Sequence, residues 1–262
     1  MLTKLFKNDF AWIFNKAMWI YYLVLILVTI SVKIVENVKQ NLFLVMVDKV
    51  LVGIFISCCI SILITCFMRI WVRFITNLYK DESYLTHTLP VTKNQIFNAK
   101  VLASIITLII SLLVIVACVA FAYLNENTFE ELRVMYDSLV HAYNGVIAVI
   151  FVIGLVLLII LEMINLMMAG IFGIIAGHRS NNYRMIKSIF IGIACYFAVA
   201  IIIVSTVNII SENLLNEVVT NGFPGIKTLS TMGLTSLALY IISILFFYFN
   251  SKRILNKGVN VE

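Results

Sequence analysis

The sequence has few of the charged and turn-forming residues on which water-soluble domains depend. Only 12% of its 262 residues are Asp, Glu, Lys or Arg, whereas 62% are hydrophobic. Soluble domains average about 25% charged residues, so this chain could not cover a water-exposed surface of ordinary size. Its two prolines and 11 scattered glycines form no flexible linker. The composition therefore predicts an integral membrane protein.

The sequence also lacks the patterns of several kinds of functional site. Its Lys and Arg residues do not cluster with aromatic residues on a polar face, so we predict no nucleic-acid partner. The five cysteines lie in apolar runs without C-x-x-C spacing, which argues against disulfides and zinc. No hydrolase motif such as H-E-x-x-H or G-x-S-x-G is present. We therefore predict no metal site, no catalytic residues and no enzymatic activity in this chain.

What the sequence does contain is a series of long apolar segments. A transmembrane helix needs about 20 such residues. We predict an all-α membrane protein, a single transmembrane domain over 1–262, with spans at about 17–33, 50–72, 95–124, 142–177, 186–211 and 228–251. The fourth of these is longer than the hydrocarbon core, so we expect it to project beyond the bilayer or to break.

Three further segments lie outside the spans. Residues 2–16 place Leu and Phe at helical spacing, with lysines mostly on the other side, which predicts an amphipathic helix on the membrane surface. Residues 125–141 are acidic and fit a small amphipathic helix. Residues 212–227 contain Gly222, Pro224 and Gly225, which fit a turn or a re-entrant dip.

The distribution of basic residues predicts the orientation of the chain. If both termini are cytoplasmic, 14 of the 19 Lys and Arg residues lie in segments on the inner side and 5 in segments on the outer side. Cytoplasmic segments of membrane proteins carry the excess of Lys and Arg. We therefore predict a multi-pass protein of the cell membrane with both termini in the cytoplasm.

The most polar run of the chain, LYKDESYLTHTLPVTKNQI at residues 78–96, then falls on the cytoplasmic side. Asp81 is a suitable N-cap for a short helix, with Glu82 in its first turn. Pro90 disfavours helix at the residue before it. Thr92 and Gln95 fit the T-x-x-Q capping box, so the next helix is predicted to begin there. We expect a rigid bend between helices, with a surface of mixed polar and apolar character that is suited to docking a soluble partner.

This stretch resembles a loop of a known family. Residues 81–103, DESYLTHTLPVTKNQIFNAKVLA, look like the first cytoplasmic loop of bacterial ABC export permeases of the second type (ABC-2), which often reads D-E-x-Y-L-T-x-T-L-P-V-[ST]. Ser83 stands where glycine is common in that family. The six-span plan with an amphipathic N-terminal helix agrees over the rest of the chain.

The resemblance implies a transport subunit driven by a partner. In this family the loop includes a coupling helix that sits in a cleft of the cytoplasmic ATPase. The implied coupling residues are Asp81, Glu82, Tyr84, Leu85, Thr86, Thr88, Leu89 and Pro90. The chain contains no G-x-x-x-x-G-K-[ST] loop, so ATP and Mg²⁺ would be bound by separate ABC ATPase subunits. The second permease of the assembly would be another copy or a related chain.

The expected cargo is a hydrophobic or amphipathic substrate, such as a peptide toxin, a bacteriocin or an antibiotic, because the spans offer few polar groups. Two alternatives stay open. A secondary transporter usually needs several polar groups and broken helices at the midplane of the membrane. The spans of this chain contain one glutamate and no proline, which makes this alternative weaker. A non-transporting scaffold or immunity protein would bind something other than an ATPase through the same loop.

Glu162 lies deep in the fourth span, about 22 Å from Gly177 at 1.5 Å per residue. A charge is costly there and usually faces a cavity or a partner. Asn165 lies one turn on, and Ser205 and Asn208 of the fifth span are candidate partners. One interpretation is that Glu162, Asn165 and Asn208 line a transport path or gate. The other is that Glu162 locks helix packing.

Overall fold

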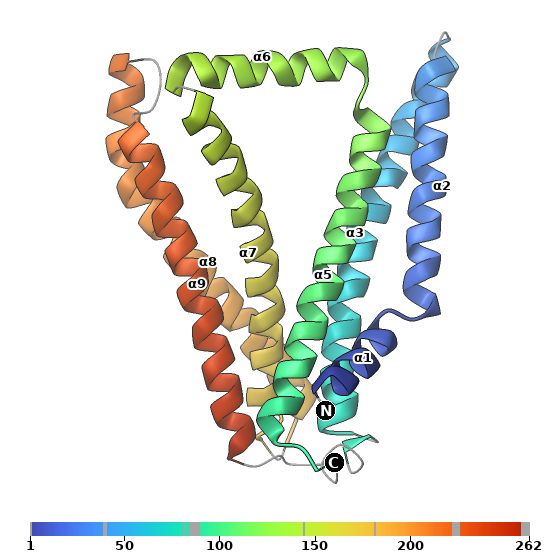
Figure 1. Ribbon diagram of the computed structural model, residues 1–262, viewed down its shortest axis with the longest axis vertical. Coiled ribbons are helices and arrows are strands. Elements are labelled where there is room, and N and C mark those ends of the chain that lie inside the picture. The colour runs from blue at the N-terminus through green and yellow to red at the C-terminus, as the bar shows by residue number, and fades with distance from the viewer. Residues whose placement is uncertain are drawn as a thin grey trace. The chain divides into compact units, whose positions relative to one another are not determined.

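The computed structural model describes residues 2–38, 41–80, 82–83, 90–143, 145–180, 182–221 and 226–257. Within these ranges all regular secondary structure is helical. The helices are α1 (Leu2–Ile13), α2 (Lys16–Val38), α3 (Leu42–Leu78), α5 (Lys93–Tyr123), α6 (Glu126–Tyr143), α7 (Gly145–Gly177), α8 (Arg184–Asn221) and α9 (Ile226–Asn256) (Figure 1).

Six of these helices are long and apolar enough to cross a membrane: α2, α3, α5, α7, α8 and α9. They coincide with the six predicted spans, so the chain is a multi-pass α-helical membrane protein. The predicted boundaries are too short in several places. Helix α3 has 37 residues, or about 55 Å, and includes residues 42–49, which were expected in an external loop. Helix α7 runs without interruption for 33 residues, about 50 Å, and therefore exceeds the hydrocarbon core of about 30 Å.

The segments outside the spans are also largely helical. The acidic segment forms α6, as predicted. Residues 212–221 continue α8 rather than forming a turn, and the residues from Gly222 to Gly225 lie outside the described ranges. The N-terminal helix ends at Ile13, earlier than the predicted residue 16. The reason is that Asn15 begins the next helix, with its side-chain oxygen accepting a hydrogen bond from the amide of Ala17 at 2.7 Å.

The chain forms two compact units, one over 1–131 and the other over 132–262. In unit 1, helices α2, α3 and α5 pack against one another, and α1 packs across one end of α3 and α5 (Figure 1). At the other end, the Lys33 ammonium of α2 donates to the Ala122 carbonyl of α5 at 3.5 Å and to the Asn125 side chain. Asn125 in turn donates to Glu36 at 2.7 Å, so unit 1 carries polar ties at both ends.

In unit 2, α7 packs most extensively on α8 and also contacts α9. Small residues near the end of α7, Gly173 and Gly177 among them, allow the backbones of two helices to come close together. A Cβ atom added to Gly173 would lie 2.6 Å from the Gly192 Cα and from the Ser188 carbonyl oxygen. A Cβ added to Gly177 would also overlap Ser188. Glycine is therefore required at both positions by the approach of the α8 backbone.

This contact gives a test of the packing of unit 2. We expect Gly173→Ala to lower the free energy of unfolding by about 1–3 kcal/mol, because the added methyl must displace backbone rather than a flexible side chain. The matched control is Gly154→Ala on the same helix, where an added Cβ meets nothing within 4 Å. The unfolding free energies of both variants are measured by denaturation in mixed detergent micelles, followed by circular dichroism. Equal stability of the two variants would contradict the close contact.

Candidate functional site: a buried ion network at the start of the polar loop

The polar loop begins where α3 ends, and the described part of it is tied to three helices. Arg69, Arg73 and Asn77 recur every four residues, so they share one face of α3. Arg73 is 2% exposed, an unusual degree of burial for an arginine. Its position is explained by the acids that surround it.

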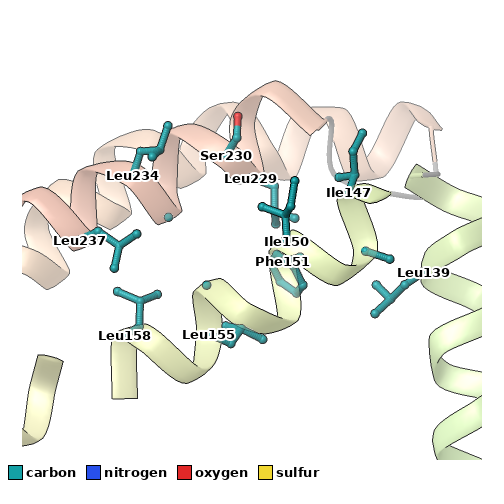
Figure 2. Close-up of a pocket in the computed structure, with 13 residues that line it drawn as sticks. Leu139, Ile147, Ile150, Phe151, Leu155, Leu158, Leu229, Ser230, Leu234 and Leu237 are labelled. Atoms are coloured by element: carbon teal, nitrogen blue, oxygen red, sulfur yellow. The ribbon is translucent and has the colours of Figure 1, made fainter. Parts of the chain in front are cut away.

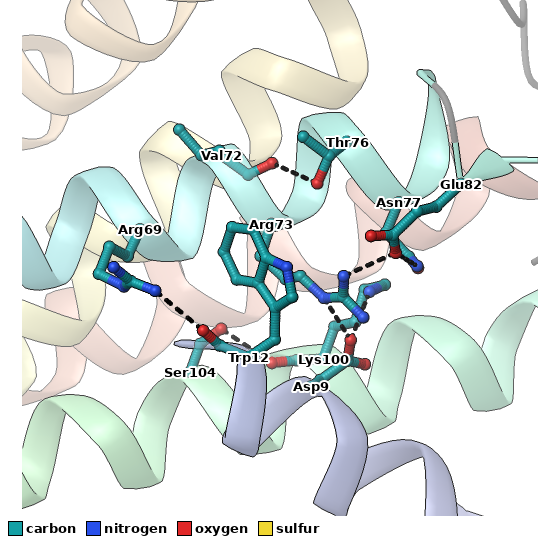
Figure 3. A network of polar contacts seen from close by, with 10 residues as sticks. All are labelled: Asp9, Trp12, Arg69, Val72, Arg73, Thr76, Asn77, Glu82, Lys100 and Ser104. Atoms are coloured by element: carbon teal, nitrogen blue, oxygen red, sulfur yellow. Dashed lines mark hydrogen bonds and ion pairs between the residues drawn. The ribbon is translucent and has the colours of Figure 1, made fainter. Parts of the chain in front are cut away.

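Asp9 of α1 is the acid at the centre of the network (Figure 3). Its Oδ1 atom accepts a hydrogen bond from Arg73 Nε at 2.7 Å and another from Lys100 Nζ of α5 at 2.9 Å. The side chains of Asp9 and Lys100 are 5% and 1% exposed. One carboxylate therefore joins cations from two helices that lie far apart in the sequence.

Glu82 connects this centre to the loop. Its Oε2 atom accepts from Arg73 at 2.7 Å and from Asn77 at 2.9 Å. With Glu82 included, two acids balance two bases, and their attraction offsets part of the cost of removing Asp9, Arg73 and Lys100 from water. Burial alone raises the pKa of the Glu82 carboxyl, but the hydrogen bond from Asn77 and the charge of Arg73 outweigh it, so the pKa is lowered overall.

Arg69 fixes the C-terminal end of α1 one turn away. It donates to the Ile13 and Trp12 carbonyls at 2.8 and 2.9 Å. These carbonyls have no partner within their own helix, and the negative end of the helix dipole favours a cation there. The Trp12 ring also lies 5.1 Å from the Arg73 guanidinium, at cation–π distance.

The other end of the loop is the predicted capping box. Thr92 Oγ1 accepts from the Gln95 amide at 3.3 Å, and Gln95 Oε1 accepts from the Thr92 amide at 3.2 Å, so α5 begins at Lys93. This prediction is confirmed. Pro90 is exposed just before it. The other predicted coupling residues, Asp81, Tyr84, Leu85, Thr86, Thr88 and Leu89, lie outside the described ranges, as does the expected cap at Asp81.

In unit 2, the two predicted polar residues of α7 each bond to a neighbouring helix. Glu162 accepts from the Tyr196 hydroxyl of α8 at 2.6 Å. Asn165 is buried and accepts from Ser243 of α9 at 2.8 Å. Asn208 is exposed and lies 12 residues beyond Tyr196, about 18 Å further along α8. The structure thus gives Glu162 a tyrosine partner in place of Asn208, and puts Asn208 at a different level of the unit.

Asp9 is the residue that sequence reasoning missed. A signal for it exists, because Leu5, Asp9 and Ile13 are spaced by four and so share the face that packs on unit 1. A lone acid on an apolar face requires a basic partner, but the pattern does not say which one. Elsewhere in the described ranges, no group of three or more His, Cys, Asp or Glu residues could hold a metal ion.

Searches against protein-family models, curated proteins and solved structures find no significant match to this chain.

The network predicts a large cost for removing its central acid. In Asp9→Asn, two buried cations keep only Glu82 as a partner, so we expect a loss of about 3–5 kcal/mol in unfolding free energy. The double variant Asp9→Asn, Lys100→Met removes one acid and one base together, and part of the loss should be recovered. Chemical denaturation in detergent measures the unfolding free energies of the wild type, the single variant and the double variant.

The matched control for this experiment is Asp137→Asn. Asp137 and Arg133 form an exposed ion pair at 4.0 Å on α6, and such pairs contribute little. We expect a change within about 0.5 kcal/mol. A loss in Asp9→Asn no larger than in this control would show that the buried network does not stabilise unit 1.

The lowered pKa of Glu82 predicts a pH dependence. A carboxylate whose folded pKa is lowered stabilises the protein above its unfolded pKa, and this contribution disappears as the pH falls through the folded value. The difference in stability between the wild type and Glu82→Gln should therefore be constant above neutral pH and shrink below pH 4.5, the ordinary value for glutamate.

Unfolding midpoints measured at pH 3–7 test this expectation. Glu131→Gln serves as the control because Glu131 is an exposed glutamate on α6. A difference between wild type and Glu82→Gln that stays the same down to pH 3 would rule out a charged Glu82 as part of the network.

Proposed function

We propose that this chain is the membrane-spanning permease subunit of an ATP-driven ABC exporter of the ABC-2 type. Separate cytoplasmic ATPase subunits would dock on the loop around Asp81–Pro90 and bind ATP and Mg²⁺. A second permease, identical or related, would complete the path. The six apolar helices and the family-like loop motif support this proposal.

The observation that carries the proposal is the ion pair between Glu82 and Arg73. A coupling loop must pass a movement of the ATPase to the spans. Arg73 is a residue of the long helix α3, and through Asp9 it is joined to α1 and to Lys100 of α5. A displacement of the loop would therefore act on three helices together rather than on one flexible connection.

The proposed mechanism involves no chemistry on this chain. ATP binding would bring two ATPases together, the loop would follow, and unit 1 would move as a body relative to the membrane. The exported substrate would be hydrophobic or amphipathic, because the spans present mostly apolar side chains. A peptide toxin, a bacteriocin or an antibiotic fits that description. The protein would reside in the bacterial cell membrane with both termini in the cytoplasm.

Within this proposal, the contacts of Glu162 and Asn165 favour a packing role. Glu162 bonds to Tyr196 of α8 and Asn165 bonds to Ser243 of α9, so together they hold α7 to both helices. An exposed Asn208 on α8 is the better placed of the three to meet a substrate or lipid.

The direct test is whether a neighbouring gene encodes an ABC ATPase and whether this chain binds and stimulates that ATPase. We expect wild-type protein in nanodiscs to bind it and to raise its ATP hydrolysis. The double variant Leu85→Asp, Leu89→Asp should bind at least about 100-fold more weakly, because two charges would enter an apolar contact without partners.

The matched control is Leu132→Asp, Met135→Asp, which makes the same chemical change on exposed apolar side chains of α6. It should bind and stimulate like the wild type. Unchanged binding by the loop variant would overturn the coupling assignment. Absence of any ATPase partner would favour the scaffold or immunity alternative.

A further inference from the structure

Unit 2 contains an apolar cavity between α7 and α9, close to the end of α6 (Figure 2). Its volume is about 240 Å³. For comparison, an engineered apolar cavity of about 150 Å³ stays dry and binds benzene. The lining side chains include Leu139 from α6, Ile147, Phe151 and Leu158 from α7, and Leu229 and Leu237 from α9.

The chemistry of the walls decides what this space can hold. Among the described residues that line the cavity, Ser230 carries the only polar side chain, so a water molecule there would lack the two to four polar partners that it needs. An empty cavity of this size would forfeit the dispersion contacts of its walls. The occupant that the walls favour is therefore hydrocarbon.

The shape of the cavity favours a linear chain. Its lining extends along α7 from Ile147 to Leu158, which is about 16 Å of helix. In Figure 2, Leu158 and Leu237 point toward one another across the end of the cavity that lies far from Leu139. The other end reaches α6, an amphipathic helix with exposed charges such as Arg133 and Asp137. One end of the cavity is thus near polar groups, and the rest is apolar.

Two glycines keep the cavity open. Gly154 of α7 and Gly233 of α9 both line it, and a Cβ added to either would meet nothing within 4 Å. These glycines therefore differ from Gly173, where the neighbouring backbone leaves no room. Their absence of side chains preserves space rather than allowing helices to touch.

The cavity is also continuous with the lipid-facing surface. Its lining includes Ile150 and Leu234, whose side chains are 63% and 65% exposed. Both belong to helices that are candidate membrane spans, where bilayer hydrocarbon is the surrounding medium. A hydrocarbon chain can therefore enter from the side without crossing water.

We propose that this cavity is a binding site for one acyl chain of a membrane lipid, with the lipid headgroup near α6. The site does not depend on the exporter function proposed above, because only α6, α7, α9 and the bilayer are needed to form it. The lipid would fill the space between α7 and α9 and support their packing.

The test uses the full chain in bilayers that contain phosphatidylcholine with a photoactivatable diazirine on one acyl chain. After irradiation, labelled peptides are quantified by mass spectrometry at increasing amounts of unlabelled phosphatidylcholine. We expect saturable labelling of residues 147–158 and 229–237. Gly154→Leu and Gly233→Leu, which fill the cavity from opposite walls, should reduce this labelling at least about tenfold.

The matched control is Gly53→Leu, which adds the same side chain to another apolar helix where a Cβ meets nothing within 4 Å. In this variant the lipid probe should label α7 and α9 to the same extent as in the wild type. Equal labelling in wild type and Gly154→Leu, or an equal drop in Gly53→Leu, would overturn the proposal. Labelling that an apolar peptide displaces but unlabelled lipid does not would overturn it as well.

Folding of the variants is checked by thermal unfolding in detergent. Leucine at either glycine enters open space, so we expect unfolding temperatures no lower than that of the wild type. The two substitutions lie on different helices, and one folded variant is enough for the labelling comparison. Unfolding of both would show that the space is not open and would also overturn the proposal.

Discussion

The arrangement of unit 1 depends on one buried carboxylate that holds two cations. The hydrophobic effect between apolar helix faces is non-directional, so one apolar neighbour can substitute for another. The bonds from Arg73 and Lys100 to Asp9 are not interchangeable, since a shift of one turn would leave charges buried without partners. The network therefore sets the register of α1 against α3 and α5, whatever its net contribution to stability.

The same interaction determines how the polar loop leaves the membrane helices. At one end Glu82 is bound to Arg73 and Asn77, and at the other end the Thr92–Gln95 capping box starts α5. Both attachments are made to rigid helices rather than to other loops. Glu82 and Thr92, two described residues near the ends of the loop, therefore have defined positions relative to α3 and α5. An element that couples a partner to the spans of a transporter requires such anchoring. A scaffold protein with a docking loop would benefit from the same anchoring.

Much of the fold could be predicted because it depends on local signals. Apolar length predicts the six spans, and the T-x-x-Q motif predicts the start of α5, since both act within a few residues. Helix ends were predicted less well: Asn15 stops α1 early, and residues 42–49, of which only Asp48 and Lys49 are polar, extend α3 because its helical hydrogen bonds begin before the predicted start of the span. The pairing of Asp9 with Arg73, and of Glu162 with Tyr196, could not be predicted. Periodicity assigns a residue to a face, but only tertiary packing decides which distant face it meets.

The glycines of unit 2 divide α7 into a part that packs tightly against α8 and a part that borders the cavity. At Gly173 and Gly177 the backbone of α8 is so near that no side chain fits, so α7 and α8 are packed tightly at this contact. Toward the other end, beside Gly154, side chains do not fill the space between α7 and α9. Because α7 is a continuous helix of 33 residues, a rotation about the Gly173 contact would displace the end beside α6 further than the residues near the contact. Such a rotation would change the volume of the cavity, and a molecule that fills the cavity would oppose it.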